Sequence, residues 1–106
     1  MLPATIWRGQ QRERPYIHAS LASEGFIHCT GDATLLVWVA NQFYSRDADD
    51  FLILCIDEAR VTAPVQWDPV GDKVFPHLYG PLNVDAIVAV TPFPRDEAGV
   101  FLPPPL

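Results

Sequence analysis

Hydrophobic positions in this chain follow a helical spacing in one place and strand-like runs elsewhere. The spacing i, i+3, i+4 and i+7 is met by Leu36, Val39, Ala40 and Phe43. These residues share one side of a helix, so they predict a packed helical face. Thr30 or Asp32 is the expected N-cap, because both side chains accept hydrogen bonds from the first backbone N–H groups. The helix is predicted to end near residues 45–46.

Several apolar runs have the length and composition of β-strands. They are residues 26–30, 51–56, 65–68 and 87–91. The run 51–56 is apolar throughout, which predicts a strand at the centre of a sheet. Pro69 is expected to end the strand that precedes it. Pro76 is expected to make residues 74–79 extended but irregular, because proline donates no backbone hydrogen bond.

The remaining segments are predicted as short helices, loops and turns. Residues 4–14 are predicted to form a short helix around Trp7, and residues 16–25 a loop. Asp57 is expected to cap a single turn after the central strand. The order of strand, helix and then several strands predicts an α+β fold with one main helix and a mixed or largely antiparallel sheet.

The length of 106 residues fits one domain, 1–106, with a single core. Within it, residues 1–15 are interpreted as a variable N-terminal segment and residues 102–106 as a proline-rich tail. Gly25 and Gly80 are expected to hold backbone conformations that other residues resist, since one precedes a strand and the other a proline.

The charge and composition exclude some classes of function. The net charge is −6 and the pI about 4.7, which argues against non-specific binding to nucleic acid because such binding depends on basic residues. Hydrophobic residues make up 49%, so a globular chain is expected. No apolar run is long enough to cross a bilayer and no signal peptide is recognisable, so the expected location is cytoplasmic. Cys29 and Cys55 lie in apolar runs, and neither a disulfide nor structural zinc is predicted.

Two of the three histidines stand in similar settings, in the segments EGFIHCT and FPHLYG. His28 is followed two positions later by Thr30, and His77 by Tyr79. Side chains at i and i+2 of a strand face the same side, so each motif presents an imidazole beside a hydroxyl. We expect the two motifs to line one concave ligand site, with two satisfied core histidines as the alternative. His77, beside Pro76, is expected to be the more exposed histidine.

These motifs, with SLASEGFIHCT, a WDP before a turn and the closing AVTPFP, resemble the bacterial domain-of-unknown-function family DUF952. The resemblance runs from Trp7 over nearly the whole remaining chain, and EGFIHC followed by FPHLYG is highly specific. The fold of this family is similar to that of ADP-ribosyltransferases. The resemblance therefore implies a split mixed sheet around a cleft that holds NAD in many members of that fold. The residues alone identify no cofactor, and NAD is the one that the resemblance suggests.

The chain departs from the family pattern at its start. Members begin with a strand of the type Ile-Tyr-His-Ile and a helix carrying a tryptophan, and Trp7 to Tyr16 match that helix and its following tyrosine in spacing. No histidine precedes Trp7. Either the first strand and its histidine are missing, or ATIWR is itself the first strand and the helix has been lost. A missing strand would expose a sheet edge, which a homodimer would cover. Asp68 stands where the family usually has Glu.

The motifs and the resemblance favour an ADP-ribosyltransferase-like domain that binds a nucleotide or another phosphorylated or ribosylated small molecule, with NAD-type glycosyl chemistry as its reaction. The ligand-binding residues would be His28, Thr30, His77, Tyr79 and Ser20. The catalytic carboxylate would be Glu24 or Asp68. Such a group orients a ribose hydroxyl and stabilises positive charge as the glycosidic bond breaks.

Two alternatives remain open. The first is a non-catalytic module that binds a small molecule in the same cleft, which a missing first strand would favour. The second is a metal site made of His28, His77 and Asp68, because two histidines and a carboxylate are an acceptable ligand set. The expected partner is a small-molecule ligand, and neither nucleic acid nor a membrane is expected.

Overall fold

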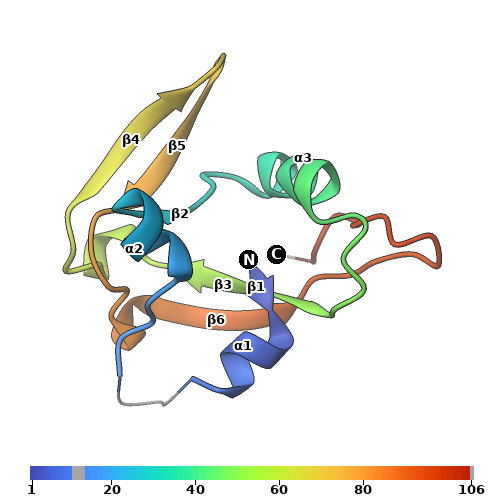
Figure 1. Cartoon of the computed structure of the whole chain (residues 1–106), viewed down its shortest axis with the longest axis horizontal. Helices are drawn as coiled ribbons and strands as arrows, with labels where there is room; N and C mark the ends of the chain where they lie inside the picture. The colour runs from blue at the N-terminus through green and yellow to red at the C-terminus, as the bar shows by residue number, and fades with distance from the viewer. Residues whose placement is uncertain (11–13, 106) are drawn as a thin grey trace.

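Two separate three-stranded antiparallel sheets form the framework of this small α+β domain (Figure 1). The structure is a computed structural model that describes residues 1–10 and 14–105. The first sheet has the order β1-β3-β6, formed by Leu2–Pro3, Phe51–Ile56 and Ile87–Pro92. The second sheet has the order β2-β5-β4, formed by Ile27–His28, Lys73–Leu78 and Val65–Val70. The predicted α+β class and the prevalence of antiparallel pairing are confirmed.

The strand β3 lies at the centre of the first sheet, as its continuous apolar run predicted. It pairs with β1 on one side and β6 on the other. Phe51 and Ile53 belong to one core cluster, whereas Leu52 and Leu54, on the opposite face of the strand, pack against another. A strand that meets apolar side chains on both faces needs an apolar residue at every position.

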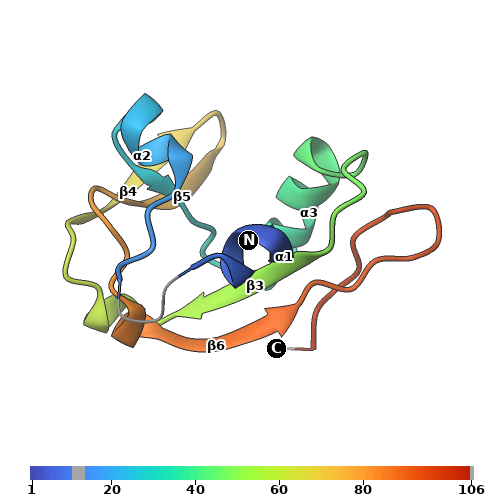
Figure 2. The same cartoon turned by 60° about the horizontal axis from the view of Figure 1, so that its bottom comes forward.

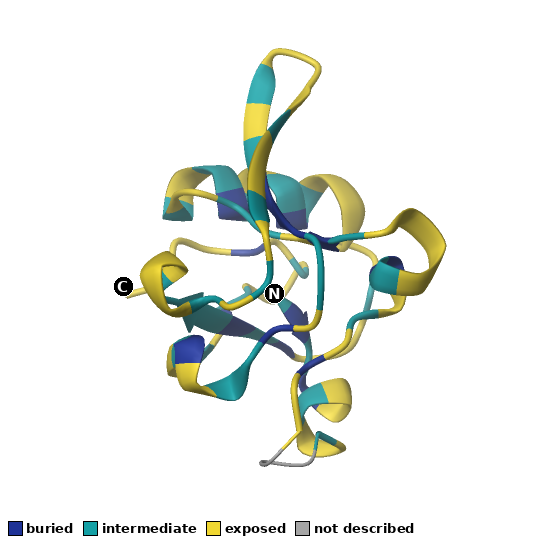
Figure 3. Ribbon diagram, turned by 90° about the vertical axis from the view of Figure 1, so that its left-hand side faces the viewer, coloured by how far each residue is buried: buried dark blue, intermediate teal, exposed yellow. Residues whose placement is uncertain are grey.

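The strands β4 and β5 form a hairpin that projects from the body of the molecule, with an exposed tip (Figure 3). Val70 pairs with Lys73, and Gly71 in the turn has a φ of 64°. The prediction that Pro69 ends its strand is wrong, since β4 continues to Val70. The strand β4 is at the edge of its sheet, where half of the backbone groups have no partner strand and proline is tolerated.

The strand β5 is regular, so the irregularity predicted around Pro76 is also wrong. The carbonyl of Pro76 accepts a hydrogen bond from Cys29 N at 3.1 Å, on the side that faces β2. The nitrogen of Pro76 faces that same side, because the N–H and C=O of one residue in an antiparallel strand point together. The strand β2 ends at His28. The N–H that Pro76 lacks would therefore lie where the pairing of β2 with β5 stops.

The helices are short apart from one. The α-helices are α1 (Ala4–Arg8), α2 (Ala19–Glu24) and α3 (Ala33–Phe43), and the 3-10 helices are η1 (Glu58–Arg60) and η2 (Val84–Ala86). The carboxylate of Asp57 accepts a hydrogen bond from Ala59 N at 3.1 Å, which confirms the predicted cap of η1. Within the described part of the chain, no helix has the length and apolar character needed to span a membrane.

The main helix α3 begins as predicted, because Asp32 accepts a hydrogen bond from Leu35 N at 2.7 Å. Leu36 and Ala40 are buried on its inner face. The predicted packing of Phe43 is wrong, since this side chain is 72% exposed. Phe43 is the last residue of the helix, so the apolar spacing continues past the turns that contact the core.

The helix α2 occupies a segment that was predicted as a loop. His18 caps it, because its Nδ1 accepts a hydrogen bond from Ser20 N at 3.0 Å. Gly25 ends it in the left-handed conformation, with a φ of 89°. The prediction failed because six residues show little helical periodicity and histidine is not among the usual capping residues.

The N-terminal segment contains both a strand and a helix, so neither alternative offered for it is right. Leu2 of β1 pairs with Leu52, and the ATIWR segment forms α1. The predicted helix over residues 4–14 ends earlier, at Arg8, with Gly9 as its C-cap, and residues 11–13 lie outside the described part of the chain. The first strand is short rather than missing, and a homodimer stays a prediction.

Two clusters of buried side chains hold these elements together. One lies between the two sheets and contains Leu2, Tyr16, Ile27, Leu78, Leu82 and Ala86. The other lies between α3 and the first sheet and contains Leu36, Ala40, Phe51, Ile53, Phe93 and Phe101. Figure 2 shows that the second sheet with α2, and the helix α3, lie over different ends of β3 and β6. The first sheet is therefore the common base of both clusters.

The two glycines singled out in the sequence differ in what constrains them. Gly25 has a positive φ, as expected, and no atom lies near the position of a Cβ. Gly80 is not among the described glycines with a positive φ, so that part of the prediction is wrong. A Cβ on Gly80 would lie 2.9 Å from the Cβ of Ala63. Close packing, and not backbone conformation, requires glycine at this position.

Replacing Gly80 with valine should lower the free energy of unfolding by about 1–3 kcal/mol, because the backbone at Gly80 or Ala63 must shift to admit the side chain. The control is Asp49→Ser at an exposed position, which should change stability by less than about 0.5 kcal/mol. Urea unfolding of both variants measures the effect. A Gly80→Val midpoint equal to that of the wild type would show that the close contact is relieved without cost.

Candidate functional site

The two histidine motifs lie side by side in the second sheet, as predicted. Antiparallel pairing of β2 with β5 sets His28 directly opposite His77. Their ring centroids are 5.1 Å apart, with the rings nearly perpendicular at 81°. Side chains of directly paired residues stand on the same face of a sheet. The register of two short strands therefore brings together two imidazoles that are far apart in the sequence.

His77 is held by Asp68 on the neighbouring strand, and Tyr79 in turn holds Asp68. Its Nδ1 lies 2.8 Å from Oδ2 of Asp68 on β4, and the hydroxyl of Tyr79 donates to the same carboxylate oxygen. An ionised carboxylate only accepts hydrogen bonds, so the proton between them is on Nδ1. No hydrogen bond joins Nε2 of His77 to any other described residue. A neutral His77 thus keeps a free lone pair on Nε2.

His77 is buried, with an exposed fraction of 3%, whereas the side chain of His28 is 52% exposed. The expectation that His77 would be the more exposed histidine is therefore wrong. The strand β5 is central in its sheet, and β2 is a two-residue strand at the edge. Position in the sheet, rather than the neighbouring proline, decides which imidazole solvent reaches.

Phe26 joins the two histidines and was not identified from the sequence as a site residue. Its ring stacks on His77, with centroids 4.2 Å apart and an interplanar angle of 19°. It also meets the edge of His28 at 4.8 Å and lies 5.3 Å from the ring of Tyr79. The available signal was its position two residues before His28, which places both on one strand face. Phe26 covers one side of His77 and fixes the orientation of its ring.

His28 makes an exposed hydrogen bond with the last residue of α2. Its Nε2 lies 2.8 Å from Oε2 of Glu24, whose side chain is 50% exposed. Pairs of this kind contribute little to stability, since water competes for both partners. The Glu24 carboxylate can therefore be displaced by a ligand without a large energetic cost. We refer to Glu24, Phe26, His28, Asp68, His77 and Tyr79 as the histidine cluster.

His18 is a further polar residue outside the histidine cluster, in the segment 16–25 that was predicted as a loop. Burial lowers the pKa of His18, and the nearby His28 lowers it further. Ser20, a predicted ligand residue, is buried and has its Oγ 2.8 Å from Nδ1 of His18. Thr30, another predicted ligand residue, lies past the end of β2 and is half-buried, outside the contacts of the cluster.

Hydrogen bonds shift the acidity of the groups around His77. The Tyr79 hydroxyl and, second, the imidazole of His77 lower the pKa of Asp68 below its ordinary value of 3.8. The same hydrogen bond to Asp68 raises the pKa of Tyr79, because ionising the phenol would remove the donated proton. Asp68 therefore stays ionised and Tyr79 stays neutral over the physiological pH range.

Replacing Tyr79 with phenylalanine should raise the pKa of Asp68 toward 3.8, because it removes the largest cause of the lowered value. The folded-state pKa is below the unfolded one, so the ionised carboxylate stabilises the fold above about pH 4 and this contribution is lost as the pH falls further. The stability difference between wild type and Tyr79→Phe should then narrow in acid. Carboxyl 13C NMR titration measures the pKa, and an unchanged value for Asp68 would contradict this account.

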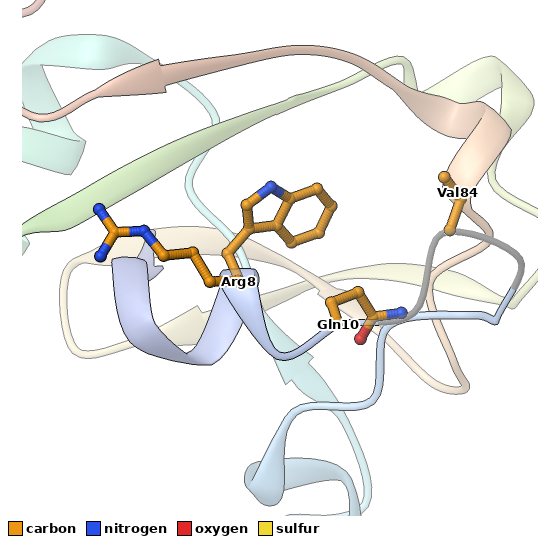
Figure 4. A pocket seen from close by; sticks show the side chains of 4 residues that line it. Arg8, Gln10 and Val84 are labelled. Carbon is orange, nitrogen blue, oxygen red and sulfur yellow. The ribbon is translucent and has the colours of Figure 1, made fainter.

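Two hollows on the surface lie apart from the paired histidines. One, of about 290 Å³, is lined by Trp7, Arg8, Gln10 and Val84 (Figure 4). The other, of about 340 Å³, is lined by Pro3, Ile6, Tyr16, Ile17, His18 and Ala19. Neither corresponds to the concave pocket that was expected between the two motifs. The ring of Phe26 occupies the space against His77, and no residue of the histidine cluster lines the second hollow.

The three side chains suggested as metal ligands, His28, His77 and Asp68, are not arranged around one position that a metal ion could occupy. Nδ1 of His77 and Oδ2 of Asp68 form a hydrogen bond with each other. In residues 1–10 and 14–105, no group of three or more His, Cys, Asp or Glu side chains is placed to hold a metal ion.

Comparison with known proteins shows the family and the fold. Two crystal structures of protein CC0527 from Caulobacter crescentus, one of them a double mutant, match with a TM-score of 0.79. Each is 23% identical in sequence, and the match covers 95% of this chain and 89% of that chain. No curated protein matches significantly. The sequence model of a protein family of unknown function, DUF952, matches residues 1–90. The chain therefore belongs to the DUF952 family, as its histidine motifs indicated.

Proposed function

We propose that the histidine cluster binds a phosphorylated or ribosylated small molecule, of which a nucleotide is the simplest example. The observation that carries this proposal is the state of His77. Asp68 and Tyr79 hold its ring in one orientation and leave Nε2 without a protein partner. Groups that are fixed by a neighbouring residue and still have bonding capacity are typical of binding and catalytic sites.

The two imidazoles offer different contacts to such a ligand. Nε2 of a neutral His77 accepts a hydrogen bond, which suits a ribose hydroxyl. His28 is exposed and bonded only to Glu24, so an anionic group of the ligand can replace that carboxylate. A molecule that carries a hydroxyl and a phosphate a few ångströms apart matches this pair. Nucleotides and sugar phosphates both have these groups.

NAD-type glycosyl chemistry, which the family resemblance noted in the sequence would imply, would need a carboxylate near the ribose. Asp68 already accepts hydrogen bonds from His77 and Tyr79, so its role in this proposal is to position His77. Glu24 is the carboxylate that can move to a substrate, since its partner His28 is exposed. In the reaction, the C–N glycosidic bond would break with its electron pair leaving on nicotinamide, while Glu24 stabilises the positive charge on the ribose. Water would then form the new C–O bond at that ribose carbon and lose its proton to solvent.

Binding without turnover is the second candidate. It is favoured because both carboxylates of the histidine cluster are engaged by protein side chains, Asp68 by two and Glu24 by one. Without rearrangement, neither would reach a ribose hydroxyl. Release of nicotinamide from NAD distinguishes the two candidates, because only an enzyme produces it.

The proposal is tested by calorimetric titration with NAD, ADP-ribose and 2′-phosphorylated nucleotides. We expect at least one of them to bind and His28→Ala to weaken that binding about tenfold, as expected for one lost hydrogen bond to a charged group. The control is Asp49→Ser, at an exposed position of the loop before β3 and outside the histidine cluster, which should bind like the wild type. Absence of binding by all three ligands, or equal affinities of wild type and His28→Ala, would contradict the proposal.

A further inference from the structure

The two paired histidines share one pattern of hydrogen bonding. Nδ1 of His77 is hydrogen-bonded to Asp68, and Nε2 of His28 is hydrogen-bonded to Glu24, each at 2.8 Å. Within residues 1–10 and 14–105, the second nitrogen of each ring has no hydrogen-bond partner. A histidine that binds a metal ion almost always donates its other ring N–H to a carboxylate or a carbonyl. Both imidazoles thus have the bonding state of metal-binding histidines.

The free nitrogen of His77 is accessible although the residue is buried. In the part of the chain that the structure describes, the buried side-chain polar atoms without a hydrogen-bond partner are the hydroxyl oxygens of Tyr16 and Thr91. Nε2 of His77 has no partner and is not one of these atoms, so it keeps contact with solvent. Phe26 stacks on the face of the ring. A metal ion binds in the plane of an imidazole, at its edge, so the stacking does not cover the position that an ion would take.

The strand pairing brings the two rings within reach of one ion. Cys29 and Pro76, the pair next to His28 and His77, are joined by a backbone hydrogen bond, so the two histidines form a non-hydrogen-bonded pair. Facing side chains are closest at such pairs. The ring centroids are 5.1 Å apart. Two nitrogens that bind one tetrahedral zinc ion lie about 3.4 Å apart, which rings at this distance can reach because His28 is exposed and free to adjust.

The charge around the two imidazoles favours a cation. Glu24 and Asp68 each contact one ring, and Asp68 stays ionised because its pKa is lowered, chiefly by the Tyr79 hydroxyl. The ion pairs of lysine and arginine among the described residues involve Asp57 and Asp72, not these two carboxylates. Imidazole binds a metal ion in its neutral form, so the carboxylates give the site a net negative charge when the ion enters.

We infer that His28 and His77 bind one divalent transition-metal ion, such as Zn²⁺, through Nδ1 and Nε2 respectively. Imidazole nitrogen suits zinc, copper and nickel better than magnesium or calcium. Asp68, suggested from the sequence as a third ligand, stays on Nδ1 of His77 and positions that ring. Water completes the coordination of the ion, and a phosphate oxygen of the proposed ligand can replace it. The metal site goes beyond the proposed function and does not depend on it.

Calorimetric titration of the tag-free protein with Zn²⁺ tests this inference. We expect the wild type to bind one equivalent and His28→Ala to bind at least about tenfold more weakly, since the loss of a residue that merely orients a ligand already costs about tenfold or more. The control is His18→Asn, which removes the remaining histidine and keeps a side chain able to cap α2. This variant should bind zinc like the wild type.

Nitrogen-15 NMR of the imidazole rings locates the bound ion. Zinc should shift the resonances of Nε2 of His77 and Nδ1 of His28 far more than those of His18. Absence of zinc binding, equal affinities of wild type and His28→Ala, or binding that leaves both of these resonances unshifted would overturn the inference. The last two results would place the ion elsewhere, for example at a cysteine thiol. The titrations with NAD and ADP-ribose, performed without zinc, decide the proposed function separately.

Discussion

Replacing His77 with alanine should lower the free energy of unfolding by about 2–4 kcal/mol, whereas His28→Ala should lower it by less than about 1 kcal/mol. His77 is buried, so its removal leaves a cavity beneath Phe26. It also leaves Asp68 without one of its two hydrogen-bond partners. His28 is half-exposed and bonded to an exposed carboxylate, so water replaces what the variant loses.

Urea unfolding followed by far-UV circular dichroism measures both variants, and they serve as controls for each other. The two replaced histidines lie opposite one another on paired strands and differ mainly in burial. The same variants distinguish a ligand-binding role from a structural role, since His28→Ala should lose ligand affinity while keeping its stability. Equal losses of stability in the two variants would show that His28 has a structural role. His28 would then no longer be assigned to ligand binding.

The second large effect is expected at Arg95, where Arg95→Ala should lower the free energy of unfolding by about 2–4 kcal/mol. The guanidinium donates hydrogen bonds to four backbone carbonyls. These are the carbonyls of Asp47 at 2.6 Å, Asp49 at 2.9 Å, Ser45 at 3.1 Å and Gly99 at 3.1 Å. It also lies 4.2 Å from the ring of Phe101, which is buried in the core. One side chain thus joins the C-terminal segment to the loop between α3 and β3.

Arg95→Lys tests whether the geometry of the guanidinium or only its charge is needed. An ammonium group is compact and cannot reach four carbonyls at once, so lysine should recover less than half of the lost stability. The control is Arg60→Ala, because the pair of Arg60 with Asp57 is exposed and long, at 3.4 Å, and should contribute little. Thermal and urea unfolding of the three variants measure these effects. Full recovery by lysine would show that charge alone suffices at this position.

Several features of the fold could be predicted because they depend on neighbours in the sequence. The apolar run Phe51–Ile56 indicated a central strand, and the structure gives it apolar contacts on both faces. Asp32 and Asp57 were predicted as caps, which needs only a short polar side chain two or three residues before a free N–H group. The juxtaposition of the two histidine motifs was also predicted, from their similar surroundings and the family resemblance.

Other features could not be predicted because they depend on contacts between distant parts of the chain. The burial of His77 follows from the central place of β5, which is set by pairing with both β2 and β4. The role of Arg95 depends on carbonyls that are about 50 residues away in the sequence. The packing of Phe101 in the core, directly before the proline-rich tail 102–106, was not predicted from the sequence. Each of these contacts joins segments whose spacing in the sequence contains no information about their distance in space.

The sequence by itself determined the α+β class, the main helix, the central strand and the residues at which polar chemistry was expected. Periodicity and capping are local properties, so they are readable from neighbouring residues. Only the tertiary structure decided that Phe26 stacks on His77 and that Asp68 and Tyr79 orient the ring of His77. Sheet register and helix placement bring these side chains together, and both are set by the burial of apolar surface across the whole domain.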